Sequence, residues 1–256
     1  ASTGVIGHPL NMEKIKEGIE TIAPLLSEEG GIDATNAIRT TDTFDKNLSV
    51  TIELDGVPVT IGGMAKGSGM IHPNMATMIG IVTTNANIDK ATLQQLFSES
   101  VNESYNMVSV DGDTSTNDTA MILANGLAKH TKITSADSEH YQKFKEALNF
   151  VNIRLAQMIA RDGEGATKLI EAVVTGAATK EEARNVGKEV ITSSLVKAAM
   201  FGEDGNWGRI ICAIGNSGAK FTPNAITVGM KGGDYSVPLI ANGRGVESQA
   251  GPDSNE

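Results

Sequence analysis

The sequence predicts a mixed α/β fold, in which helices pack against sheets that are not purely parallel. Segments with the helical repeat of apolar residues alternate along the chain with short runs of β-branched residues. Residues 50–54 and 57–61 alternate apolar and polar side chains around Asp55-Gly56, which predicts a hairpin with a two-residue turn. Because a hairpin is antiparallel, we expect mixed α/β layers.

The first helix is expected at residues 11–29, where apolar residues recur at helical spacing. After the hairpin, a glycine-rich loop at 62–76 leads to residues 79–82, a short β-branched run that predicts a buried strand. Asp89 is expected to open the next helix, and a long helix is expected at about 137–160. The apolar stripe of the first helix consists of Ile15, Ile19, Ile22 and Leu26.

Towards the C-terminus, Thr179 with Glu182 three residues later is a capping-box pattern, which predicts a helix that ends near Gly202. Strands are expected in four segments, at residues 168–174, 209–214, 226–230 and 236–241. The chain has no internal repeat and no long linker. We therefore expect residues 1–246 to form a single catalytic region, followed by a polar tail at 247–256.

Composition excludes several classes of function. The chain has 256 residues and a formal net charge of −10, which argues against a nucleic acid as partner. No stretch approaches the roughly 18 apolar residues of a membrane span, and no signal peptide precedes the first elements, so we expect a cytoplasmic protein. The single cysteine, Cys212, excludes an internal disulfide and a cysteine-rich zinc site. Because it lies in an apolar run, we expect a buried structural thiol.

Four segments are rich in Gly, Thr, Asn and Asp, at residues 2–7, 62–77, 109–118 and 162–168. Each of them alone could be a surface turn. Neither the dinucleotide-binding nor the phosphate-binding glycine pattern occurs, and the Gly-x-Ser-x-Gly elbow of serine hydrolases is absent. The four histidines fall at no ligand spacing, and the acidic cluster of 111–118 lacks the later Glu of a calcium loop, so no metal site is expected.

Threonine chemistry is the remaining route to catalysis. A hydroxyl nucleophile needs a neighbouring base, and a threonine at the start of a chain carries one in its own α-amine, whose pKa is about 8. The bond between Ala76 and Thr77 follows the glycine-rich loop, at the start of an expected strand. Cleavage of this bond would free Thr77 as a nucleophile. From the residues alone, a structural threonine at a strand start remains the alternative.

A resemblance to a known family favours the nucleophile. The run Lys66-Gly-Ser-Gly-Met-Ile-His-Pro-Asn-Met-Ala-Thr-Met78 resembles the self-cleavage region of the ornithine acetyltransferase (glutamate N-acetyltransferase) family of arginine biosynthesis. Five further segments resemble family motifs in the family's order: Ser2-Thr-Gly-Val-Ile-Gly7, Thr40-Thr-Asp-Thr43, Ser109-Val-Asp-Gly-Asp-Thr-Ser-Thr-Asn-Asp-Thr119, Asp162-Gly-Glu-Gly-Ala-Thr-Lys168 and Gly205-Asn-Trp-Gly-Arg209. The resemblance extends from residue 1 to about 245.

The resemblance implies an N-terminal-nucleophile-like fold of stacked sheets and helices, cleaved between Ala76 and Thr77. Residues 1–76 and 77–246 would be parts of an α chain and a β chain that stay associated, commonly as an α2β2 heterotetramer. Thr77 is implied as the nucleophile and first residue of the β chain. The other implied site residues are Thr3 and Gly4 at the oxyanion hole, and Thr40, Lys66 and Glu164, together with Thr77, at the substrate.

The implied reaction moves an acetyl group from N-acetylornithine to glutamate through an acyl-threonine, without a metal or other cofactor. Some family members also accept acetyl-CoA. Lys66 is expected to bind a carboxylate, and Glu164 the side-chain ammonium of ornithine. The alternative for Lys66, which lies eleven residues before Thr77, is that it tunes the Thr77 α-amine. The family's leading segment and its C-terminal substrate residues have no counterpart here, so we expect a fragment of the family's full length. The alternatives are an N-terminal-threonine amidase or aminopeptidase, and an inactive fragment that retains the fold.

Overall fold

The structure is a computed structural model that describes residues 3–72 and 78–246. The chain divides into two compact units, at Ala1–Ala166 and Thr167–Glu256, and each is described by itself. The predicted cleavage bond between Ala76 and Thr77 lies outside the described residues, as does the predicted tail at 247–256. The prediction that residues 1–246 act as a single catalytic region stays a prediction.

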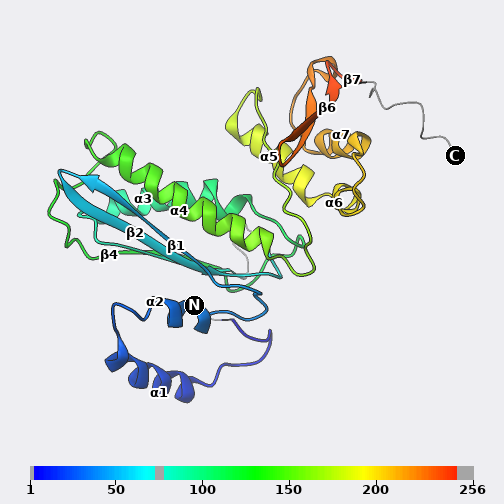
Figure 1. Ribbon diagram of the computed structural model, residues 1–256. Helices are drawn as coiled ribbons and strands as arrows, with labels where there is room; N and C mark the ends of the chain where they lie inside the picture. The colour runs from blue at the N-terminus through cyan, green and yellow to red at the C-terminus, as the bar shows by residue number, and fades with distance from the viewer. Residues whose placement is uncertain (1–2, 73–77, 247–256) are drawn as a thin grey trace. The chain divides into compact units, whose positions relative to one another are not determined.

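The first unit contains a four-stranded mixed sheet in the order β1-β2-β3-β4 (Figure 1). Its strands are β1 (Lys46–Leu54), β2 (Val57–Lys66), β3 (Ile79–Thr84) and β4 (Thr119–Ala124). The first three strands are antiparallel neighbours, whereas β3 and β4 are parallel. Asp55 and Gly56 join β1 to β2 with positive φ angles of 53° and 73°, as a type I′ turn requires. The hairpin and the mixed α/β fold are thereby confirmed.

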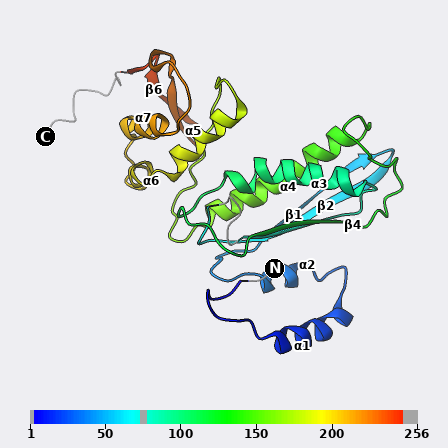
Figure 2. The same cartoon turned by 180° about the vertical axis from the view of Figure 1, so that it is seen from behind.

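Two helices, α3 (Lys90–Glu103) and α4 (Tyr141–Arg161), lie side by side along the same side of this sheet (Figures 1 and 2). Asp89 caps α3, because its carboxylate accepts the backbone N–H groups of Ala91 and Thr92. The helix α4 comes so close to β2 that a Cβ on Gly63 would lie 2.9 Å from Leu155 Cδ1. Fully buried residues between sheet and helices form the core: Val59, Ile61, Val82, Phe144, Leu148, Val151 and Leu155.

The N-terminal part of the first unit contains α1 (Met12–Ile22), the 3₁₀ turn η1 (Ala23–Leu25) and α2 (Gly31–Ala37). The helix expected at 11–29 therefore exists but is shorter, because Pro24 lies in the 3₁₀ turn that follows Ile22. None of the residues of α1 is buried. Three residues of the predicted stripe lie in this helix and the fourth, Leu26, follows the 3₁₀ turn; all four are exposed: Ile15, Ile19, Ile22 and Leu26.

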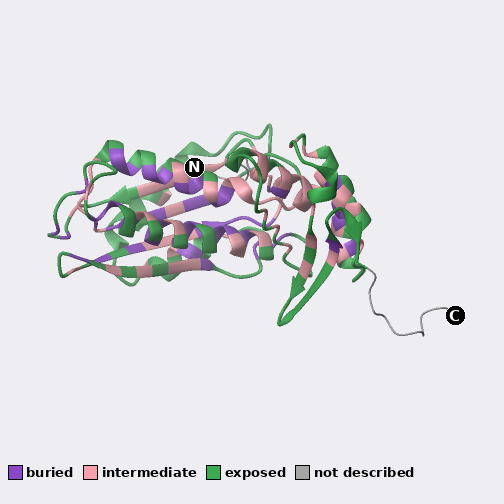
Figure 3. Ribbon diagram, turned by 90° about the horizontal axis from the view of Figure 1, so that it is seen from above, coloured by how far each residue is buried: buried purple, intermediate pink, exposed green. Residues whose placement is uncertain are grey.

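The second unit contains three helices and a small antiparallel sheet in the order β5-β6-β7. Its elements are α5 (Lys180–Thr192), α6 (Ser194–Phe201), α7 (Trp207–Asn216), η3 (Pro223–Ala225), β5 (Val228–Gly232), β6 (Tyr235–Ala241) and β7 (Arg244–Gly245). Its buried core is small and consists of Val196, Ile210 and Ala213. Most of the buried residues instead belong to the sheet and helices of the first unit (Figure 3).

The helix predicted after Thr179 is confirmed, since the Thr179 hydroxyl accepts the backbone N–H of Glu182 at 3.1 Å. It does not run unbroken to Gly202. Ser193 ends α5 and caps α6, with its hydroxyl accepting the backbone N–H of Val196.

Two of the four strand predictions for this unit are wrong. Residues 168–174 form no strand, and 209–214 lie inside α7. Asn206 caps α7, and the buried residues Ile210 and Ala213 are three apart, which is helical spacing. The expected buried thiol is wrong for the same reason, because Cys212 occupies the exposed face of this helix. The strands expected at 226–230 and 236–241 are confirmed as β5 and β6.

Within the described residues, no helix has both the length and the apolar character needed to cross a membrane.

Candidate active site

Three segments singled out from the sequence meet at the end of the sheet where β1 begins and β2 ends. They are residues 40–43, 66–69 and 162–164. The carbonyl oxygen of Ser68 accepts the backbone N–H of Glu164 at 2.8 Å, and the Ser68 hydroxyl lies 2.5 Å from that of Thr41. The structure therefore brings together the segments that carry three predicted substrate residues: Thr40, Lys66 and Glu164.

A buried ion cluster, consisting of Asp42, Lys46, Lys66 and Asp162, joins the same segments. The Lys46 ammonium lies 2.7 Å from Asp42 Oδ1 and 2.5 Å from Asp162 Oδ2, and the three side chains are at most 2% exposed. Asp162 also accepts hydrogen bonds from the backbone N–H and the hydroxyl of Thr43. Two carboxylates and two ammonium groups balance in charge, and paired charges of this kind are the ones that proteins can bury.

The hydrogen bonds of the cluster keep its carboxyl groups ionised. Burial alone would raise the pKa of Asp42, but the N–H of Gly67, the Lys46 ammonium and the N–H of Thr40 together hold that pKa below its ordinary value. Burial likewise acts to raise the pKa of Asp162, and hydrogen bonds from Lys46 and Thr43 outweigh it. Both residues are therefore negatively charged near neutral pH.

Lys66 occupies a different position from Lys46 in the cluster. It ends β2, is 2% exposed, and its ammonium lies 4.0 Å from Asp42 Oδ2, beyond hydrogen-bonding distance. Burial lowers the pKa of Lys66; the charges of Asp42 and Glu164 oppose this shift, and that of Lys46 adds to it. A buried ammonium with a counterion nearby but not bonded to it is suited to bind an added carboxylate.

Glu164 is exposed, and its carboxylate lies directly over the backbone of Gly69. A Cβ on Gly69 would meet the Glu164 carboxyl carbon at 2.5 Å, so a side chain there would displace it. The two predicted charge partners of the substrate therefore differ in burial. Because solvent screens an exposed carboxylate, we expect a weaker contribution to binding from Glu164 than from Lys66.

The loop at 109–118 forms hydrogen bonds with the chain on both sides of residues 73–77. On the N-terminal side, the Asp111 carboxylate accepts the backbone N–H groups of Met70 and Ile71 at 2.6 and 3.0 Å. The hydroxyl of Ser109 lies 2.9 Å from His72 Nδ1. This loop, which the sequence indicates by its composition and by a family-like motif, thus holds in place the segment that leads to the predicted cleavage bond.

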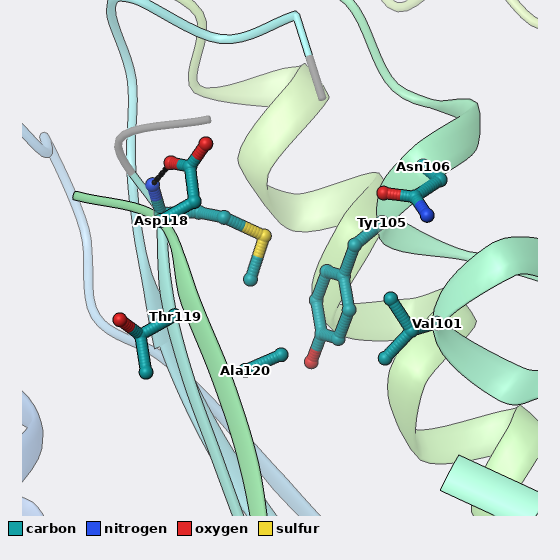
Figure 4. A pocket seen from close by; sticks show the side chains of 7 residues that line it. Val101, Tyr105, Asn106, Asp118, Thr119 and Ala120 are labelled. Carbon is teal, nitrogen blue, oxygen red and sulfur yellow. Dashed lines mark hydrogen bonds between the residues drawn. The ribbon is translucent and has the colours of Figure 1, made fainter. Parts of the chain in front are cut away.

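On the C-terminal side, Asp118 Oδ1 accepts the backbone N–H of Met78 at 3.0 Å. Its other oxygen, Oδ2, is buried and has no hydrogen-bond partner among the described residues. Burial raises the pKa of Asp118 to about 6, and the Met78 N–H opposes the shift. Asp118 and Met78 line a small cavity that Tyr105 and Asn106 also line (Figure 4).

The remaining predicted site residues stay predictions. Thr77 and Ala76 lie outside the described residues. Thr3 is half-buried and Gly4 exposed, and no hydrogen bond or ion pair between them and the buried ion cluster is found in the described part of the chain. Their assignment to an oxyanion hole thus depends on the family resemblance.

Sequence reasoning did not select Asp42 or Lys46 as site residues. Asp42 belongs to the family-like motif at residues 40–43, but its role depends on the burial of Lys46. One signal could have revealed that burial, because Lys46 precedes Leu48 by two residues and so shares the apolar face of β1. A lysine on that face of a strand requires a buried carboxylate partner.

A family profile, related sequences and a solved structure all match this chain to the same protein family. The profile of the ArgJ family matches residues 1–255. The chain is 57% identical over 226 residues to "Arginine biosynthesis bifunctional protein ArgJ" of Symbiobacterium thermophilum, which covers 88% of this chain and 56% of that protein. It is 52% identical over 242 residues to the protein of the same name in Caldanaerobacter subterraneus, covering 94% of this chain and 60% of the relative.

A solved structure agrees with the sequence relatives. The crystal structure of arginine biosynthesis bifunctional protein argJ from Bacillus halodurans is 44% identical in sequence and superposes with a TM-score of 0.63. The superposition covers 67% of this chain and 78% of that chain. The chain spans 56–60% of the length of the two curated relatives described above.

Proposed function

This chain belongs to the ArgJ family, and from that premise we propose that it carries the acyl-transfer site of an acetyltransferase of arginine biosynthesis. The proposed reaction moves the acetyl group of N-acetylornithine to glutamate, with Thr77 as the nucleophile after cleavage of the Ala76–Thr77 bond. The observation that supports it best is the convergence of segments 40–43, 66–69 and 162–164 on the buried ion cluster. Lys66 lies in this cluster and precedes Thr77 closely in the sequence.

The proposed chemistry proceeds through two acyl transfers. The Thr77 hydroxyl attacks the acetyl carbonyl while the Thr77 α-amine accepts its proton. The tetrahedral oxyanion is held by donors from Thr3 and Gly4. When the intermediate collapses, the α-amine of ornithine leaves with that proton, and the acetyl group remains as an ester of Thr77. The α-amine of glutamate then attacks the ester and regenerates the hydroxyl.

Two substrates of opposite side-chain charge must use this site in turn, and both carry an α-carboxylate. We assign that carboxylate to Lys66, whose ammonium is buried and not bonded to its counterion. We assign the side-chain ammonium of ornithine to Glu164, whose carboxylate is exposed over Gly69. The buried Lys66 would thus bind the α-carboxylate that both substrates carry. The exposed Glu164 would bind the side-chain ammonium that only ornithine carries.

The two pieces that cleavage would produce can stay together without a covalent link. Strand β2 precedes the Ala76–Thr77 bond and β3 follows it, and the two strands pair antiparallel from Ile61–Thr84 to Lys66–Ile79. A cut between them would leave one continuous sheet, with its core shared by both pieces. This supports the proposed association of the α-chain part with the β-chain part, and an α2β2 assembly remains part of the proposal.

No cofactor enters the proposed reaction, because the threonine ester conserves the acetyl group between donor and acceptor. The relatives are named bifunctional, and we therefore propose acetyl-CoA as a second acetyl donor, in addition to N-acetylornithine. A cytoplasmic location is likewise part of the proposal, as expected for an enzyme of amino-acid biosynthesis.

The proposal is tested first by self-cleavage and then by the fate of the acetyl group. The purified full chain should separate into residues 1–76 and 77 onward without added protease, and Thr77→Ser should cleave while Thr77→Ala stays intact. With labelled N-acetylornithine, label should pass to glutamate faster than it is released as acetate. Release to water at the faster rate would identify an amidase instead, and an intact wild-type chain would refute the N-terminal-threonine mechanism.

A further inference from the structure

A single carboxylate, that of Asp42, contacts the backbone of Thr40 and Gly67 and both lysines at the end of the sheet where β2 ends. Its Oδ1 accepts the backbone N–H of Gly67 at 2.7 Å and the Lys46 ammonium at 2.7 Å. Its Oδ2 accepts the backbone N–H of Thr40 at 3.1 Å and lies 4.0 Å from the Lys66 ammonium. The Asp42 side chain is 0% exposed, so these four groups are its surroundings rather than water.

The two lysines beside Asp42 are held in unequal ways. Lys46 is fully enclosed and is at hydrogen-bonding distance from both Asp42 and Asp162. Lys66 faces the same carboxylate from 4.0 Å, outside hydrogen-bonding distance. Lys46 is thus bonded to both carboxylates, whereas the Lys66 ammonium has no hydrogen-bond acceptor among the residues that the structure describes.

We propose that Asp42 is a positioning residue of the substrate site, which fixes the backbone at Thr40 and Gly67 and holds the Lys66 ammonium charged, in place and unbonded, ready for a substrate carboxylate. The proposal rests on the function proposed above, in which Lys66 binds the α-carboxylate. Asp42 itself touches neither substrate nor the reacting atoms. It acts through Lys66 and through the two backbone segments.

The charges around Lys66 make this role measurable. The groups that act on its ammonium are Asp42, Lys46 and Glu164, in addition to burial. Burial lowers the pKa of Lys66 and Asp42 supplies the largest opposing effect. Removal of the Asp42 charge should therefore lower that pKa further. Because only protonated Lys66 binds a carboxylate, substrate binding should then fail at a lower pH.

The test uses the full chain and follows kcat/KM for N-acetylornithine against pH. The acidic limb of this profile should report the Thr77 α-amine, and the alkaline limb Lys66. Asp42→Asn removes the charge and keeps a carbonyl oxygen for one of the two backbone N–H donors, of Gly67 and Thr40. It should move the alkaline limb down by about one pH unit or more. The limb should disappear in Lys66→Met, together with tight binding of substrate.

Asp162→Asn is the matched comparison, because it removes the other buried carboxylate of Lys46 and none that faces Lys66. It should lower the unfolding midpoint as Asp42→Asn does, yet leave the alkaline limb where the wild type has it. If both variants lose stability and neither moves the limb, Asp42 is a structural residue and the inference is wrong. If Lys66→Met keeps the wild-type KM and limb, the assignment of Lys66 in the proposed function fails instead.

Asp42→Glu provides a second route if the Asn variant does not fold. It keeps the charge but lengthens the side chain, which moves the carboxylate relative to the Lys66 ammonium. We expect a higher KM for both substrates, with the alkaline limb near its wild-type pH. An unchanged KM in this variant would contradict a positioning role for Asp42.

Discussion

The hairpin formed by β1 and β2 has, at each end, a contact between an aspartate and the nitrogen of a basic side chain, and the two contacts differ in burial. Asp42 and Lys46, where β1 begins, lie 2.7 Å apart with both side chains 0% exposed. Asp55 and His140, at the turn, also lie 2.7 Å apart, but their side chains are 35% and 11% exposed. The two contacts therefore have the same length but differ in their exposure to solvent.

The surroundings of the two contacts determine how strongly each charge acts on its neighbours. At the turn, water screens the contact and would replace either partner. At the buried end, a charge that loses its partner is not solvated by water. Loss of one member of the cluster therefore leaves an uncompensated buried charge, which destabilises the protein. The buried set of charges therefore fits the role proposed for Lys66, whereas the contact at the turn is open to solvent on the Asp55 side.

The largest expected effect is on stability, from Lys46→Met. The substitution leaves Asp42 and Asp162 buried without their shared cation. Breaking a buried pair in this way costs about 3–5 kcal/mol, which would show in urea unfolding of the full chain at pH 7. Lys168→Met, which removes the exposed contact with Glu203 at 3.2 Å, is the control and should cost less than about 1 kcal/mol. Equal losses would contradict the importance of burial.

The next effect is on substrate binding and separates the buried charge from the exposed one. Lys66→Met should raise KM for N-acetylornithine and for glutamate by about 10–100-fold, since a charge-assisted contact contributes roughly 1.5–3 kcal/mol. Glu164→Gln should raise KM for N-acetylornithine only, and by less, because Glu164 is exposed. Steady-state kinetics with each substrate varied in turn measures both. Equal losses for the two substrates in Glu164→Gln would refute the proposed polarity.

A smaller change tests the position of the Glu164 carboxylate without removing its charge. Gly69 has no positive φ, so alanine is compatible with its backbone, yet the added Cβ would lie 2.5 Å from the Glu164 carboxyl carbon. We expect Gly69→Ala to fold normally and to raise KM for N-acetylornithine about threefold to tenfold, within the range of one displaced charged contact. Gly215→Ala, where no heavy atom approaches the Cβ, should leave KM unchanged.

The smallest effect is expected at the exposed end, from Asp55→Asn. The N–H of Thr131 and the ring of His140 hold the pKa of Asp55 down to about 2, below its ordinary 3.8. A depressed carboxyl pKa contributes stability above about pH 4, which is lost as the pH falls towards 2. The variant should therefore flatten the acid side of the stability curve between these pH values. A wild-type slope there would mean that Asp55 is not responsible for it.

Local patterns predicted the elements whose signals are local. The Asp55-Gly56 turn, the Asp89 cap and the Thr179 cap follow from backbone conformation and side-chain hydrogen bonds within a few residues, and all three are present. The segment 209–214 was wrongly expected to be a strand, because a short apolar run fits a strand and a helix face equally well. The Asn206 cap and the burial of Ile210 and Ala213 on one side of α7 distinguish the two.

The candidate site was predictable in its motifs but not in its connections. Motifs at 40–43 and 162–168 were recognised, yet nothing in their spacing shows that Asp42 and Asp162 share the ammonium of Lys46. That contact joins residues more than a hundred positions apart, so it depends on how α4 packs on the sheet. The exposed stripe of α1 is the converse case, where a clear pattern did not predict burial.

In the proposed function, Thr77 carries the acetyl group between the two substrates. Intact-mass analysis of the full chain after brief exposure to N-acetylornithine, without glutamate, tests it most directly. We predict that the piece beginning at Thr77 gains one acetyl group, that peptide mapping assigns it to Thr77, and that glutamate then removes it as N-acetylglutamate. A cleaved chain that turns over both substrates without ever carrying an acetyl group on Thr77 would contradict the account.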